Sequence, residues 1–170
     1  MTELKTPDVK WHESWAETVL EFDEEYPHGS GLDPGAIDVT PEGCAAFVAE
    51  RLRGADPEAP RPEGIVLSDN FWITDGDEVV GFLAVRHGLT PSLLEEGGHI
   101  GYSVRPSRRR EGHASRALAL GLIRAKELGL RRVLLTCDED NPGSRRTIEN
   151  AGGVYEDSRR GKRRYWIATA

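Results

Sequence analysis

The stretch from His99 to Cys137 constrains the fold more than any other part of the sequence. It begins with a β-rich run, HIGYSV at 99–104, and ends with an almost wholly apolar run, RRVLLTC at 131–137. Between them, seven small or apolar residues fall on one face at helical spacing: Ala114, Ala117, Leu118, Gly121, Leu122, Ala125 and Leu128. Strand, turn, helix and strand form a βαβ unit, so we expect parallel strands at 99–104 and 132–137 joined by a right-handed crossover.

The flanking segments predict a layered α/β protein with one domain over residues 1–170, a length that suits a single domain. Apolar and aromatic positions at helical spacing predict a helix from Trp11 to Tyr26, and Thr40 and Pro41 have the residue types that open a second helix, reaching Leu52. The run FWITDGDEVVGFLAVRH predicts a hairpin with a turn at 75–77. A short helix near 142–151 and a hairpin after it end the chain.

Charge is distributed unevenly along the chain. Residues 1–98 contain 6 basic and 21 acidic residues, whereas residues 99–170 contain 16 basic and 8 acidic ones. The pI of about 5.3 argues against a broad nucleic-acid surface, so we expect a local anion site instead. No run has the apolar length of a signal peptide or membrane span, which predicts a cytoplasmic protein without a membrane partner. Cys44 and Cys137 lack C-x-x-C spacing and are expected to be buried free thiols, with no metal site.

Five arginines, at 105, 108, 109, 110 and 116, crowd into VRPSRRREGHASRAL, residues 104–118, around Gly112 and Ala114. A turn that enters a helix presents unpaired backbone N–H groups to an anion, and small residues let a diphosphate approach the main chain. The plainer alternative is that Gly112 eases the turn and the arginines form a solvated face. Neither G-x-x-x-x-G-K-[ST] nor G-x-G-x-x-G occurs in the chain, which excludes the two commonest phosphate loops.

The same stretch resembles the acetyl-CoA-binding motif of the GNAT superfamily of N-acetyltransferases. Its R/Q-x-x-G-x-G/A pattern is met by Arg109, Gly112 and Ala114, and a second family signal, Asn-x-x-Ala/Ser after a strand, is met by Asn141 and Ser144. The resemblance implies a central mixed twisted sheet of six to seven strands, with helices on both faces and a splayed pair of parallel strands. It also implies acetyl-CoA as cosubstrate and no metal.

The resemblance further assigns residues to the cofactor. The strand would offer main-chain hydrogen bonds to the pantetheine arm, the loop amides would hold the pyrophosphate, and two residues after the next strand would flank the pantetheine and sulfur. In that order these residues are Tyr102, Ser103 and Val104; Arg109, Arg110, Glu111, Gly112, His113, Ala114 and Ser115; and Asn141 and Ser144. The arginine cluster would neutralise the phosphates.

Attack on a thioester requires a neutral amine and hence a proton acceptor. His99 stands where relatives often carry an acidic residue, and an unperturbed imidazole suits this role; the alternative is a histidine bonded to neighbouring backbone. His87 is a second candidate, and Glu95, Glu96 and Asp138 would act through water. The tyrosine that many relatives use as general acid is replaced by Ile148, which leaves Tyr102, Tyr155, Ser144 or bulk water for that role.

The expected function is transfer of an acetyl group from acetyl-CoA to a primary amine of a small molecule or peptide, by direct attack in a ternary complex. The alternative is an acyl-CoA-binding sensor or regulatory domain without turnover. The acidic first half predicts a cationic acceptor. Relatives are often dimers, which makes a homodimer an expectation of the resemblance. The identity of the amine and the acyl chain length are left open.

Overall fold

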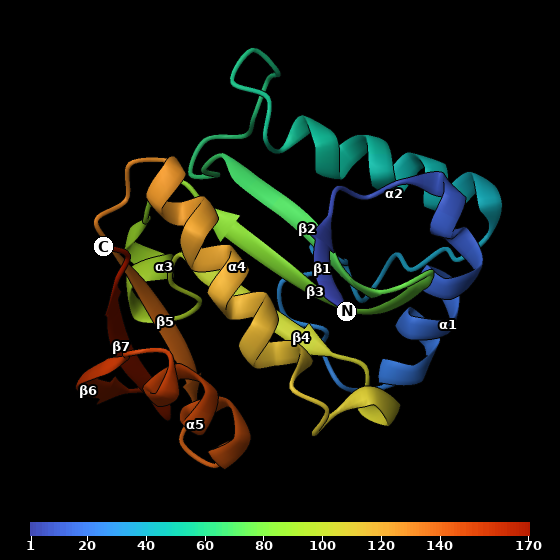
Figure 1. The fold of residues 1–170 in the computed structure, drawn as a ribbon. Helices are drawn as coiled ribbons and strands as arrows, with labels where there is room; N and C mark the ends of the chain where they lie inside the picture. Colours follow the sequence, from blue (N-terminus) through green and yellow to red (C-terminus); the bar gives the residue numbers. More distant parts are fainter.

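The computed structural model describes residues 1–170 and contains seven strands with helices on both faces (Figure 1). The elements, in chain order, are β1 Thr2–Lys5, α1 His12–Phe22, α2 Pro41–Arg53, β2 Ser68–Asp75, β3 Glu78–Arg86, α3 Pro91–Glu95, β4 Ile100–Val104, α4 His113–Glu127, β5 Arg132–Asp138, α5 Pro142–Asn150, β6 Val154–Arg159 and β7 Lys162–Ala168. Short 3-10 turns precede α1 and follow β4.

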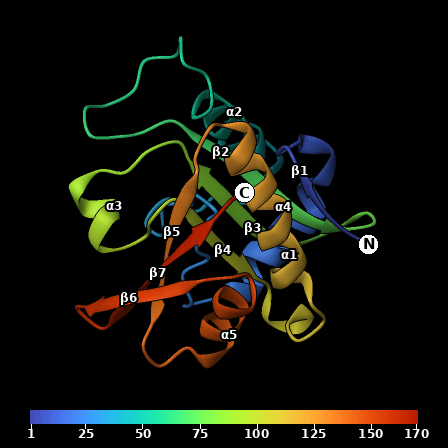
Figure 2. The ribbon, with the colours of Figure 1, turned by 60° about the vertical axis from the view of Figure 1, so that its left-hand side comes forward.

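The strands form two antiparallel sheets that meet at β4 and β5. One sheet has the order β1-β2-β3-β4 and the other β5-β7-β6. The His99 N–H donates to the Leu134 carbonyl oxygen at 2.8 Å, and further along β4 the Tyr102 side chain reaches Ser144, beyond the end of β5. The two strands therefore run in the same direction and separate after their first residues. This confirms the predicted fold with its splayed strand pair (Figure 2).

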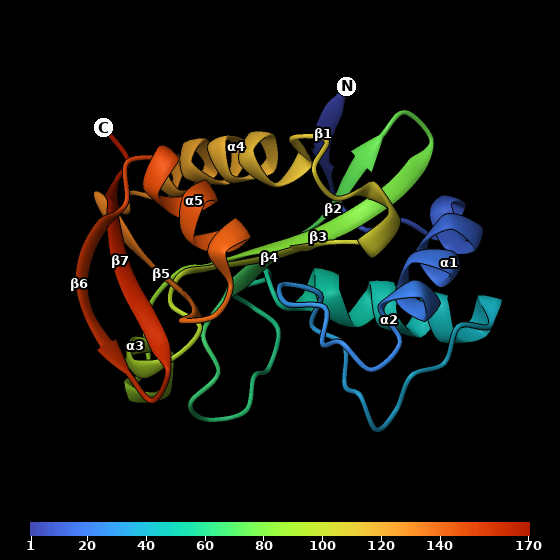
Figure 3. The ribbon, with the colours of Figure 1, turned by 90° about the horizontal axis from the view of Figure 1, so that it is seen from below.

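Alternation along β3 separates two hydrophobic cores. Leu83 and Val85 pack in one cluster with Leu118 of α4, whereas Phe82 belongs to a second cluster with Trp15 of α1. Figure 3 shows α4 and α5 on one side of the strands and α1 and α2 on the other. Trp15 and Trp72 are buried and stacked with ring centroids 6.1 Å apart, so both pack the second core, as does Trp11 at its margin.

Most predicted elements agree with the structure within one to three residues, but α1 ends at Phe22 rather than at Tyr26. Asp23 has a φ of 53°, which terminates the helix and places Tyr26 in the following loop. Two elements were not predicted. One is β1, a four-residue edge strand paired with β2. The other is α3, where Thr90 accepts a hydrogen bond from the Leu93 N–H at 3.1 Å. Thr90 and Pro91 repeat the threonine-proline signal of α2 and could have revealed this helix.

The predicted hairpin connects β2 to β3 through Gly76 and Asp77, and Gly76 has the positive φ of 62° that such a turn favours. Both cysteines are free and buried, as predicted. None of the helices combines the length and the apolar character that crossing a bilayer would require.

Candidate active site

The loop into α4 presents a row of unpaired backbone donors. The N–H groups of six consecutive residues, 110 to 115, have no acceptor anywhere in the protein. Gly112 precedes the helix with a φ of 87°, a conformation that side-chain-bearing residues rarely adopt. The positive end of the helix dipole adds to these donors. The loop therefore fits a bound diphosphate, which supports the assignment of residues 109–115 to a cofactor.

Four of the five arginines around this loop are engaged elsewhere. Arg105 is buried against Glu21, with Nη2 and Oε1 2.9 Å apart, and this contact holds the pKa of Glu21 down at about 2. Arg108 pairs with Asp75 at 2.8 Å and Arg109 with Glu25 at 2.7 Å. Arg116 donates to the Thr2 hydroxyl and to the Glu111 carbonyl oxygen.

The expectation that the arginine cluster as a whole neutralises phosphates therefore needs correction. Arg105, Arg108 and Arg109 pair with acidic side chains from the first half of the chain, and the same pattern continues elsewhere. Asp69 pairs with Arg124, and Glu95 pairs with Arg159 at 2.8 Å. The opposite charges of the two halves thus meet inside the fold. Only Arg110 is exposed and without a protein partner, so the backbone amides are the main anion donors of this loop.

The opening between β4 and β5 carries further donors. The Arg86 N–H bonds to the His99 carbonyl oxygen, and the Arg105 N–H bonds to the Val80 carbonyl oxygen. Hydrogen-bonding direction alternates along a strand, so the N–H groups of Tyr102 and Val104 point away from β3, toward β5. Main-chain donors are thus available to a ligand lying in the opening, as expected from the sequence.

Tyr102 bridges the opening with its side chain. Its hydroxyl lies 2.9 Å from the Ser144 hydroxyl, and burial raises the pKa of the phenol to about 12. Asn141 caps α5 by accepting a hydrogen bond from the Ser144 N–H at 3.1 Å. A phenol thus reaches the start of α5 from β4, although α5 itself carries the buried Ile148 in place of a tyrosine.

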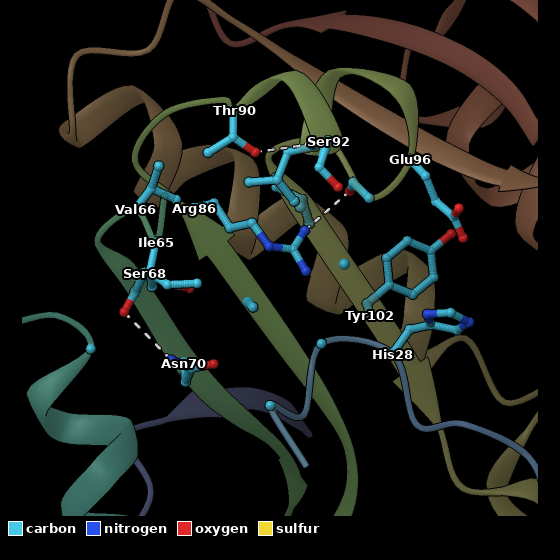
Figure 4. A pocket seen from close by; sticks show the side chains of 18 of the residues that line it. His28, Ile65, Val66, Ser68, Asn70, Arg86, Thr90, Ser92, Glu96 and Tyr102 are labelled. Carbon is cyan, nitrogen blue, oxygen red and sulfur yellow. Dashed lines mark hydrogen bonds between the residues drawn. The ribbon is translucent and has the colours of Figure 1, made fainter. Parts of the chain in front are cut away.

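A cleft of about 760 Å³ opens at this point (Figure 4). Of the residues assigned from the sequence, Tyr102, Asn141 and Ser144 line it, whereas His99, Ser103, Val104 and residues 109–115 do not. Ile100, Gly101 and Cys137 line the same region, and burial raises the pKa of the Cys137 thiol, which does not suit a nucleophile. The sequence analysis missed two lining residues, His28 and Arg86, that carry reactive or charged groups.

His99 lies in a position that argues against a role as general base. Its Nδ1 accepts a hydrogen bond from the Leu134 N–H at 2.9 Å, so in the neutral ring the hydrogen is on Nε2 and no lone pair is free. Burial, helped by Arg86, lowers the pKa of His99 to about 4. The second candidate, His87, is paired with Asp69 at 2.9 Å and lies outside the cleft. His99 therefore matches the structural alternative, in which it joins the two sheets.

This arrangement predicts a pH-dependent stability. The folded-state pKa of His99 is below its unfolded value, which is near 6.5. The free energy of unfolding should therefore decrease by about 3 kcal/mol as pH falls from above 6.5 toward 4. His99→Gln keeps an acceptor for Leu134 but cannot titrate. Chemical denaturation at several pH values should show a smaller loss over this range in the variant. Equal losses in both proteins would contradict this role.

His28 is better placed for proton transfer. It lies in the loop after α1 and lines the cleft beside Tyr102 (Figure 4), and neither of its ring nitrogens has a hydrogen-bond partner in the protein. Its backbone carbonyl oxygen accepts from the Ser103 hydroxyl at 2.7 Å. His28 is exposed at the cleft, and partial desolvation of its imidazole lowers the pKa, which favours the neutral ring at pH 7. The signal in the sequence is PHGSG, a histidine held between a proline and a glycine.

Gly29 explains why this loop can approach the sheet. Its φ is 82°, and a Cβ at this position would lie only 2.3 Å from the Gly101 carbonyl oxygen. Only glycine lets the loop pack directly on β4, which places His28 at the cleft. No cluster of three or more histidine, cysteine, aspartate or glutamate side chains is arranged to hold a metal ion.

A split sheet, unpaired amides at the start of α4 on one face and a cleft reached from the other are the features expected of an acyl-CoA-dependent transferase. The sequence model of the Acetyltransferase (GNAT) family matches residues 11–152, and the chain belongs to this family. It is an acetyl-CoA-dependent acetyltransferase. A search of curated proteins finds no relative that matches in sequence.

Solved structures of acetyltransferases share the fold. The microcin C7 self-immunity acetyltransferase MccE, in complex with acetyl-CoA and AMP, has a TM-score of 0.69 at 15% identity, over 98% of this chain and 92% of its own. RimL, a ribosomal L7/L12 α-N-protein acetyltransferase in complex with coenzyme A, has a TM-score of 0.67 at 19% identity, over 98% of this chain and 93% of its own. RimJ from Mycobacterium smegmatis has a TM-score of 0.67 at 20% identity, over 98% of this chain and 81% of its own.

Proposed function

We propose that the protein acetylates a primary amine of a small molecule or peptide, by direct attack on acetyl-CoA in a ternary complex. The observation that carries this proposal is the continuity of the cleft. It joins Tyr102 and Ser144, at the opening between the strands, to His28 on the face of α1 and α2. RimL is described as acting on a protein α-amino group, which keeps peptides among the acceptors considered.

In this proposal His28 is the general base. An alkyl amine with a pKa near 10 is protonated at neutral pH and must lose a proton before it can attack. The neutral imidazole of His28 has free ring nitrogens facing the cleft. The carboxylates of Glu96 and Asp138 also line the cleft, but both are paired with Lys162. His28 is therefore the acceptor of the proton, directly or through one water.

Tyr102 and the backbone of β4 would act on the acetyl group and its sulfur. Bound acetyl-CoA supplies a thioester: the amine nitrogen forms a C–N bond with its carbonyl carbon and the C–S bond breaks. The second proton that the nitrogen loses on becoming an amide passes to the departing sulfur, directly or through water. Strand N–H groups facing the opening would stabilise charge on the carbonyl oxygen. The Tyr102 phenol, with a pKa of about 12, keeps its proton and can donate a hydrogen bond to the leaving sulfur. Full transfer to a thiolate of ordinary basicity, near pKa 8.5, would be unfavourable.

The proposal is tested by incubating the protein with acetyl-CoA and a panel of primary amines and peptides. We expect free coenzyme A to be released only with particular amines, in amounts equal to the acetylated product seen by mass spectrometry. Acetyl-CoA binding without release for any amine would indicate the sensor function instead. Coenzyme A release without an acetylated amine would show hydrolysis and contradict amine transfer.

A further inference from the structure

The arginines of the acidic first half of the chain gather in one place. Residues 1–98 contain four arginines, and all four line the cleft: Arg51, Arg53, Arg61 and Arg86, here called the cleft arginines. Of the 21 acidic residues in the same segment, only Glu50 and Glu96 line it. The part of the cleft formed by α2 and the end of β3 is thus positively charged within a negatively charged half of the protein.

Arg86 differs from the other sheltered basic side chains in having no carboxylate partner. Ten lysines and arginines are at least partly buried: Lys5, Arg51, Arg86, Arg105, Arg108, Arg124, Arg159, Lys162, Arg163 and Arg164. Nine of them have a carboxylate oxygen within 4.0 Å, and Arg86 is the exception. Because a sheltered charge is normally paired, the exception points to an anion that the protein does not supply.

The backbone holds Arg86 in a fixed orientation. Its Nη1 donates to the carbonyl oxygens of Gly97 and Gly98 at 3.1 and 3.0 Å, while Nε and Nη2 have no acceptor in the protein. A Cβ on Gly101 would lie 3.4 Å from Nη2, so the guanidinium lies against β4, one residue from Tyr102. Figure 4 shows Arg86 extending into the cleft, with Ile65 and Val66 on one side and Tyr102 on the other.

Arg51 provides a second incompletely paired group. Its Nε is buried without any hydrogen-bond partner. Its closest carboxylate belongs to the adjacent residue, Glu50, at 3.6 Å, and that side chain is 62% exposed. Arg53 and Arg61 have no carboxylate partner and are exposed at the cleft. Planar guanidinium groups match the oxygens of carboxylates and phosphates through paired hydrogen bonds.

We propose that the amine acceptor also carries a carboxylate or a phosphate, which the cleft arginines bind through Arg86 and Arg51. This inference rests on the proposed acetyl transfer and specifies its substrate class. Coenzyme A is not the expected occupant of this site. The unpaired amides of residues 110–115 lie at the start of α4, on the other side of the strands (Figure 3). Arg86 and Phe82, which alternate onto the same face of β3, point toward α1 and α2 instead. The inference replaces the cationic acceptor expected from the charge of the first half.

The test uses matched product-like probes, so that it does not depend on finding the acceptor. N-acetylglycine, its neutral counterpart N-acetylglycinamide and inorganic phosphate are titrated into the coenzyme A-saturated protein, followed by calorimetry and by the arginine side-chain NMR signals. We expect an anionic probe to bind about 10- to 100-fold more tightly than the neutral one. Preference for N-acetylglycine assigns a carboxylate, and preference for phosphate assigns a phosphate.

Variants test whether Arg86 causes the preference for the anionic probe over the neutral one. Arg86→Gln should remove this preference, and Arg86→Lys should retain part of it. Arg131→Gln, which removes an exposed charge outside the cleft, should leave the preference unchanged. Thermal unfolding with acetyl-CoA checks that each variant is folded and still binds the cofactor. Equal binding of charged and neutral probes by a wild type that binds acetyl-CoA would overturn this inference alone. Failure to bind acetyl-CoA would overturn the proposed function and the inference with it.

Discussion

Replacing Gly112 with glutamate is expected to abolish acetyl-CoA binding. Gly112 adopts a φ of 87° amid six unpaired N–H groups, and a glutamate there would add backbone strain, bulk and a negative charge where a diphosphate must bind. We expect the Kd for acetyl-CoA to rise by at least about 100-fold, equivalent to roughly 3 kcal/mol. Because a ligand that binds the folded state raises its unfolding midpoint, thermal unfolding with and without acetyl-CoA measures the effect.

Gly129→Glu is the matched control for this variant. Gly129 follows the other end of α4 with the same φ of 87°, and a Cβ there would have no neighbour within 4 Å. The control therefore carries a similar backbone cost without touching the loop. An acetyl-CoA-dependent rise in midpoint should persist in Gly129→Glu and vanish in Gly112→Glu. If both variants keep the rise, the amides of residues 110–115 do not hold the cofactor.

Replacing His28 with glutamine is expected to lower kcat/KM by about 100- to 10,000-fold, the usual contribution of a general base. Glutamine keeps the polarity of the side chain but cannot accept the proton. The affinity for acetyl-CoA should be unchanged, which separates this variant from Gly112→Glu. Because the pKa of His28 is lowered, protonation of the base should reduce wild-type activity only below pH 6.5. Steady-state rates from pH 5 to 8 provide the measurement.

His12→Gln provides the control, since His12 lies in α1 outside the cleft and bonds to the Val39 carbonyl oxygen. It should retain wild-type rates. Full activity in His28→Gln would contradict the proposed base and leave Glu96 or Asp138 for that role. A loss of both activity and acetyl-CoA binding would instead indicate a structural role for the loop.

The βαβ unit was predictable because its information is local. Helical spacing along α4, the apolar run of β5 and Gly112 at the turn each dictate a conformation without reference to the rest of the chain. The predicted cofactor contacts Tyr102, Asn141 and Ser144 gather at one cleft for the same reason: the unit itself brings β4 and the end of β5 together.

The acceptor side could not be predicted because it depends on contacts between distant segments. His28 and Arg86 are 58 positions apart, and they line one cleft because Gly29 packs on Gly101, beside the Arg86 guanidinium. Summed charge was also misleading. Seven of the 21 acidic residues of the first half pair with basic residues of the second half, and the cleft shows the opposite charge. His99 seemed a suitable base from its position in the sequence. In the structure its Nδ1 accepts a hydrogen bond from the Leu134 N–H and so joins β4 to β5 where the two strands begin to diverge.

We expect acetyl-CoA and the acceptor to occupy opposite faces of the split sheet, and backbone NMR tests this arrangement most directly. Titrating acetyl-CoA into the ¹⁵N-labelled protein reports on each amide separately. We predict that the largest shifts fall on residues 110–115 and on the strand N–H groups of Tyr102 and Val104, with small changes at Arg51 and Arg53 of α2. Dominant shifts at α2 and the end of β3, with none at residues 110–115, would contradict the account.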